Sequence, residues 1–70
     1  MTDKYGRKII YIDYVNSIAI IEDPIYKDYT IVSRLSIKDD ILDYQIVLKF
    51  VKTLSYAKLL VDNQSLLFGD

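Results

Sequence analysis

The alternation of apolar and polar residues predicts a β-hairpin in the first third of this chain. Residues 8–15, Lys-Ile-Ile-Tyr-Ile-Asp-Tyr-Val, are rich in β-branched and aromatic side chains, which favour a pleated strand. Residues 18–22 form a second run of this kind, and Asn16 and Ser17 between the runs favour a tight turn. Both faces of the first strand are largely apolar, so we expect it to be covered on both sides.

A loop and a third strand are expected next. Asp23 and Pro24 interrupt the strand pattern, because proline has no N–H to donate to a sheet and restricts the residue before it. Residues 23–28 are therefore expected to form a loop, which carries Ile25 and Tyr26. Residues 29–35 alternate again and predict a third strand.

The second half of the chain has the period of a helix. Residues 36–39, Ser-Ile-Lys-Asp, match a capping box, with Asp in place of the usual Glu or Gln. Acidic residues near this start and lysines further along suit the helix dipole. A polar stripe recurs every three or four residues, at Gln45, Lys49, Lys52 and Tyr56. The apolar stripe roughly opposite predicts one long helix packed on the sheet, and it consists of Ile46, Phe50, Leu54, Ala57 and Val61.

The end of this helix has two interpretations. The apolar stripe favours a helix that continues to Val61, with Asn63 in the left-handed position after it. Alternatively, Leu59 and Leu60 end the polar stripe, the helix stops near residues 54–56, and residues 57–68 contain short strands. The predicted fold class is therefore α+β, with a three-stranded antiparallel sheet followed by one long helix, and with a short C-terminal strand as the alternative.

The small size of the chain favours self-association. Its 70 residues are expected to form a single domain, 1–70, yet 51% of them are hydrophobic and none is Cys, so disulfides cannot stabilise the fold. The predicted helix is apolar over most of its circumference, which is more than one small sheet covers. We therefore expect a symmetric homodimer. In this arrangement Phe50 faces the sheet and Leu48 faces the partner copy.

The composition argues against an enzyme, a metal site or a bound cofactor. The chain has no His and no Cys, which removes the usual general bases and the usual zinc ligands. Capping and turn chemistry explain the clustered acids Asp39, Asp40 and Asp43 without a catalytic role. The only two glycines lie near the chain ends, so no glycine-rich phosphate loop is expected. We assign no catalytic, metal-binding or cofactor-binding residue.

The charge pattern favours a soluble, cytoplasmic protein that does not bind nucleic acid. The formal net charge is −1, and basic residues are interspersed with acidic ones, so the electrostatic footprint of a DNA-binding protein is missing. Asp43, Lys49, Lys52 and Lys58 interrupt the longest apolar region, which makes a membrane-spanning helix improbable. No signal peptide is expected, because no basic stretch precedes an uninterrupted apolar run.

The tyrosines suggest where a partner binds. Tyrosine is enriched at interface hot spots, and Tyr26 lies beside Ile25 in the proline-containing loop. We expect a partner site at Ile25 and Tyr26, with Tyr11 or Tyr14 nearby; alternatively the two loop residues fold back over the end of the core. The leading hypothesis is a small non-enzymatic protein–protein interaction module, and composition alone, rich in Ile, Lys, Tyr and Asp, extends it to an accessory or inhibitory protein of a virus or mobile element. The alternative is a homodimeric DNA-binding transcriptional regulator.

Overall fold

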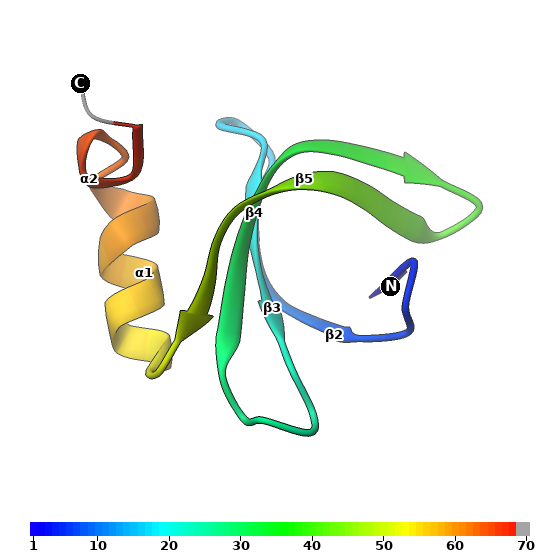
Figure 1. The fold of residues 1–70 in the computed structure, drawn as a ribbon. Helices are drawn as coiled ribbons and strands as arrows, with labels where there is room; N and C mark the ends of the chain where they lie inside the picture. The colour runs from blue at the N-terminus through cyan, green and yellow to red at the C-terminus, as the bar shows by residue number, and fades with distance from the viewer. Residues whose placement is uncertain (69–70) are drawn as a thin grey trace.

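The structure is a computed structural model that describes residues 1–68, and these residues form a closed β-barrel followed by helices (Figure 1). Each strand pairs with the next one along the chain, and the first strand also pairs with the last. The pairs are antiparallel except for that between the first and last strands, which is parallel. The elements are β1 (Thr2–Asp3), β2 (Lys8–Asp13), β3 (Ile18–Glu22), β4 (Tyr29–Lys38), β5 (Ile41–Val51), α1 (Leu54–Asp62) and α2 (Ser65–Phe68).

The fold contains both strands and helices, as expected, but the predicted arrangement of a three-stranded sheet with one long helix is wrong. The predicted hairpin is present as β2 and β3, and the predicted third strand is present as β4, which continues to Lys38. The difference lies in residues 41–51, which the helical spacing places in the long helix. They form β5, the longest strand of the barrel, and helical structure begins only at Leu54.

The turn between β4 and β5 explains why the capping-box interpretation fails. Asp39 and Asp40 have φ angles of 54° and 63°, and Lys38 pairs with Ile41 across them. Two consecutive residues with positive φ form the tight turn whose twist matches that of antiparallel strands. Because Asp enters this left-handed region more readily than most residues, the acidic pair suits a hairpin turn. Ser36, the expected helix cap, lies in β4.

Irregular pairing bends the β4–β5 hairpin around the barrel. The register shifts between Tyr29 and Ile31, between Ile31 and Val32, and between Ser33 and Ser36. Such bulges bend a strand and increase its twist. Arg34 and Phe50 lie within the shifted stretches and have positive φ angles of 52° and 62°. The bends let the two strands curl over the rest of the sheet (Figure 1).

Two apolar clusters lie on opposite faces of the sheet. β3 contributes to both, with Ile18 and Ile20 in one cluster and Ala19 and Ile21 in the other. The first cluster includes Ala57, Leu60 and Val61 of α1, so the helix covers this face. The second consists of strand residues and fills the barrel. β2 likewise contacts both clusters, which confirms the prediction that the first strand is covered on both sides.

The C-terminal helix confirms one of the two sequence interpretations. Residues 57–61 are helical, and α1 begins after Thr53, whose hydroxyl accepts a hydrogen bond from the Tyr56 backbone N–H at 3.2 Å. Asn63 ends the helix with a φ of −117°, so the predicted left-handed conformation is wrong. Its backbone N–H donates to the Leu59 carbonyl at 3.0 Å. Ser65–Phe68 then form a short helix, α2, in place of the alternative C-terminal strand.

Candidate functional site

The N-terminal strand closes the barrel through very few backbone contacts. Thr2 pairs with Lys8 of β2 and with Ile41 of β5, and Asp3 pairs with Leu42. After Asp3 the chain turns back toward β2, and the Asp3 N–H donates to the Arg7 carbonyl at 3.1 Å. The seam between β2 and β5 is therefore held by a two-residue strand together with the side chains described next.

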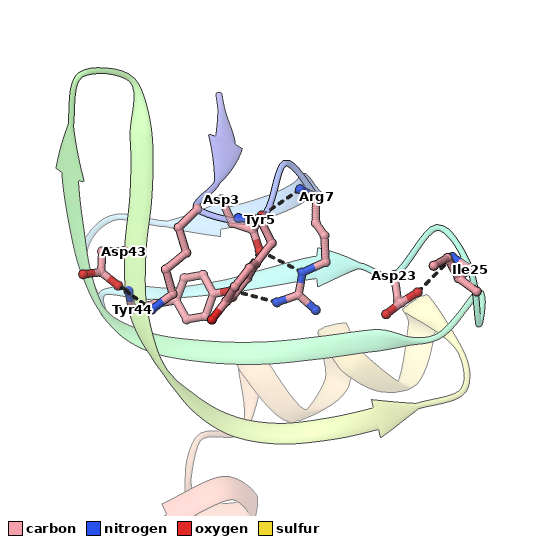
Figure 2. Close-up of polar contacts among 8 residues, drawn as sticks. Asp3, Tyr5, Arg7, Asp23, Ile25, Asp43 and Tyr44 are labelled. Carbon is pink, nitrogen blue, oxygen red and sulfur yellow. Dashed lines mark hydrogen bonds and ion pairs between the residues drawn. The ribbon is translucent and has the colours of Figure 1, made fainter.

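Asp3 is the centre of a buried polar cluster (Figure 2). Its side chain has no exposed area, and its two carboxylate oxygens accept four hydrogen bonds. Oδ1 accepts from the backbone N–H groups of Tyr5 and Arg7, at 3.0 and 2.7 Å. Oδ2 accepts from Arg7 Nε and from the Tyr44 hydroxyl, both at 2.8 Å. Arg7 Nη2 in turn donates to the Tyr44 hydroxyl at 2.7 Å, which completes the cluster.

The electrostatics of this cluster stabilise its charged form. Burial opposes ionisation of Asp3, but hydrogen bonds from Arg7 and Tyr44 outweigh it and lower the pKa of the carboxyl group. Burial likewise opposes the charge on Arg7, but its bonds to Asp3 and Tyr44 raise the pKa of the guanidinium. Burial, with the bond to Asp3, also raises the pKa of Tyr44. All three groups keep their ordinary charges at neutral pH, which suits a structural role better than proton transfer.

A second contact ties the same segment to β5. Lys4 Nζ lies 3.0 Å from Asp43 Oδ1 and 5.3 Å from the centre of the Tyr44 ring. We call Asp3, Lys4, Arg7, Asp43 and Tyr44 the polar clasp. Sequence reasoning missed it, because nothing in the residue spacing connects residues 3 and 4 with residues 43 and 44. Asp43, expected near the start of a helix, is an ion-pair partner in a strand instead.

The residues of the predicted partner site are not all close together. Ile25 and Tyr26 lie in the loop between β3 and β4 and are 79% and 74% exposed. Tyr14 is exposed too, but it lies in the turn before β3, at the opposite end of that strand. Tyr11 is half-buried against the cluster beneath α1, with Lys58 Nζ 5.7 Å from its ring centre. The structure therefore keeps the loop pair as one surface and places the two other tyrosines elsewhere.

Leu48 and Phe50 both lie on the strand β5 and not on the predicted helix. Phe50, expected to face the sheet, is 66% exposed, and that expectation is wrong because it rested on a helix that does not form. Leu48 is 40% exposed and pairs with Ile31 of β4. The expected dimer, with Leu48 as its contact, stays a prediction.

The remaining chemistry of the described residues is sparse. Over residues 1–68 there is no cluster of three or more acidic, His or Cys residues with metal-site geometry, and no pocket. In the same range, no helix is long and apolar enough to cross a membrane. The exposed surface among the predicted site residues is the pair Ile25 and Tyr26 in the loop between β3 and β4. Comparisons with protein-family models, with characterised proteins and with solved structures found no match to this chain.

Proposed function

We propose that this chain is a small non-enzymatic protein-interaction module that contacts its partner through the β3–β4 loop. The supporting observation is the exposure of Ile25 and Tyr26, two large adjacent side chains at a loop tip. The alternative, in which they fold back over the core, does not fit exposed fractions above 70%. An aromatic and an aliphatic side chain in this setting resemble the anchor residues of protein interfaces.

Hydrogen bonds within the loop hold the backbone in place at Ile25 and Tyr26. The Asp23 carboxylate accepts from the backbone N–H groups of Ile25 and Tyr26, at 2.8 and 3.0 Å (Figure 2 shows the first). These bonds from Tyr26 and Ile25 lower the pKa of Asp23, so the acceptor is charged at neutral pH. Asp23 N–H donates to the Asp28 carbonyl at 2.9 Å, which closes the base of the loop. A fixed loop loses little conformational entropy when it binds.

The test compares affinity capture by three immobilised proteins. The wild type and a Val15→Ser control, altered at an exposed position in the turn before β3, should retain the same partner from a host extract. Tyr26→Ala should lose it, with an affinity weaker by more than about 1 kcal/mol and an almost unchanged melting temperature. A Tyr26→Ala protein that melts earlier but binds with full affinity would remove the loop from the interface. Random duplex DNA serves as the probe for the alternative function, because binding to it would support a DNA-binding regulator.

A further inference from the structure

β5 has a backbone edge that no strand of the described chain covers. β1 pairs with β5 only at Ile41 and Leu42, and β4 pairs along its other side. From residue 43 to Val51, no second strand lies beside β5 within residues 1–68. Such an edge presents free N–H and C=O groups that can pair with another extended chain. β1 already pairs with the first two residues of β5, which shows that this edge accepts a strand.

The uncovered part of β5 also carries exposed apolar side chains. Ile46, Leu48 and Phe50 are 46%, 40% and 66% exposed. The φ angle of Phe50 is 62°, a strained value for an aromatic residue. Strained conformations of this kind concentrate at functional sites. We call residues 45–52, which are the second half of β5 and the residue that follows it, the β5 edge.

The stretch of sequence that contains this edge is one-sided in charge. Residues 44–61 contain Lys49, Lys52 and Lys58 and no acidic residue. The whole chain has nine basic and ten acidic residues, so the remaining residues carry six basic and ten acidic ones. Lys49 and Lys52 are exposed. The acid just before the edge, Asp43, is already paired with Lys4 at 3.0 Å.

We propose that the β5 edge binds an extended peptide segment of a partner protein in which acidic and apolar residues alternate. The segment adds a strand beside β5, its carboxylates approach Lys49 and Lys52, and its apolar residues contact Phe50 and its neighbours. This proposal rests on the proposed function and names the chemistry of the partner. It adds a second contact surface to the β3–β4 loop.

Other edges and other occupants fit less well. The outer edge of β2 is also unpaired beyond Lys8, but residues 9–13 are half-buried and offer less contact area. A lipid surface supplies charge and apolar contact but no groups that pair with a free strand edge. A second copy that pairs through the same edge brings lysines of both copies into one small interface. The acidic peptide alone supplies the opposite charge together with backbone pairing.

The experiment measures the fluorescence anisotropy of a labelled synthetic peptide in which Glu alternates with Val. Full-length wild-type protein should bind it, and a matched peptide of alternating Lys and Val should bind at least about tenfold more weakly. Backbone N-methylation of the Glu–Val peptide should abolish binding, because strand addition needs its N–H groups. The Lys49→Glu/Lys52→Glu protein should reverse the preference and bind the Lys peptide.

Two further variants separate binding from stability. Phe50→Gly relieves the backbone strain, so it should melt no earlier than the wild type and yet bind the peptide at least about tenfold more weakly. Leu66→Ser, an exposed position on α2, should bind like the wild type. Equal binding of both peptides, binding that survives N-methylation, or no binding would overturn the proposal.

Other occupants of the edge give distinguishable results. Binding to phosphatidylserine vesicles without peptide binding would assign the edge to a membrane surface. A dimer that Phe50→Gly dissociates and the peptide does not disrupt would assign it to a second copy. In either case a capture that depends on Tyr26 would still support the proposed function, so the two proposals can fail separately.

Discussion

The Tyr44 hydroxyl donates to the buried carboxylate of Asp3 at 2.8 Å, across 41 positions of sequence. This bond joins the N-terminal strand to β5 at the place where the barrel closes. Because β1 has only two residues, side chains must supply much of what holds the seam. The closure of the barrel therefore depends on a polar contact inside an otherwise apolar cluster.

Tyr44→Phe tests this dependence. The substitution keeps the ring but removes a hydroxyl that donates to Asp3 and accepts from Arg7. We expect the free energy of unfolding to fall by about 1–3 kcal/mol, because Asp3 stays buried with one donor fewer. Urea denaturation followed by circular dichroism measures this. Tyr5→Phe, at a side chain 71% exposed, is the matched control and should be neutral; equal stability of all three proteins would show that the clasp does not hold the barrel.

The lowered pKa of the Asp3 carboxyl group predicts that the fold is acid-sensitive. The pKa of Asp3 is lower in the folded protein than in the unfolded chain, because Arg7 and Tyr44 donors outweigh the effect of burial. Its contribution is therefore complete above the unfolded pKa and is lost as the pH falls through the folded pKa, below about pH 4. Asp13, Asp23 and Asp43 act in the same direction.

Unfolding midpoints measured in urea from neutral to acidic pH check this expectation. The wild type should lose stability steeply below about pH 4. Asp3→Asn should be less stable at neutral pH and should lose less on acidification, because one of the shifted carboxyl groups is gone. A wild-type profile that is flat down to strongly acidic pH would contradict the role of Asp3.

The strands of the first half could be predicted because local signals agree there. In residues 8–35, β-branched residues, turn residues and Pro24 all indicate strands and loops, and the structure follows them. In residues 39–56 two local signals conflict. Ile46, Val47 and Val51 suit a strand, but their neighbours also fall into stripes with helical spacing. Tertiary pairing with β4 decides the outcome, and a periodic pattern cannot reveal it.

The candidate sites also differ in whether the sequence could predict them. The β3–β4 loop could be predicted, because Asp23 and Pro24 interrupt the strand pattern. Ile25 and Tyr26 follow them directly and therefore fall in the loop. The clasp could not, since Asp3 and Tyr44 meet only when the barrel closes. The β5 edge was hidden by the helical interpretation. The run of residues 44–61, with lysines but no acids, was its visible signal.

Asp40→Gly distinguishes the hairpin from the helix that the sequence suggested. Asp40 has a φ of 63° in the turn, a conformation that glycine adopts without strain, so the variant should be more stable by up to about 1 kcal/mol. At the start of a helix the same change would remove a favourable acid and destabilise the protein. Ser36→Ala is the companion variant: it should be nearly neutral in β4 but cost about 1 kcal/mol as a helix cap. Thermal melts of the two variants decide between the structures.

Three substitutions to Asp along β5 provide the sharpest check of its placement. The helical interpretation required Phe50→Asp to unfold the protein, but Phe50 is 66% exposed, so this variant should stay folded with a nearly unchanged melting temperature. Leu48→Asp should lose about 1–2 kcal/mol, because the Leu48 side chain is partly covered. Val51→Asp should unfold the domain, since Val51 is 4% exposed in the cluster beneath α1 and an unpaired charge there costs several kcal/mol. Circular dichroism melts rank the three, and a Phe50→Asp protein less stable than Val51→Asp would mean that β5 is placed with the wrong face outward.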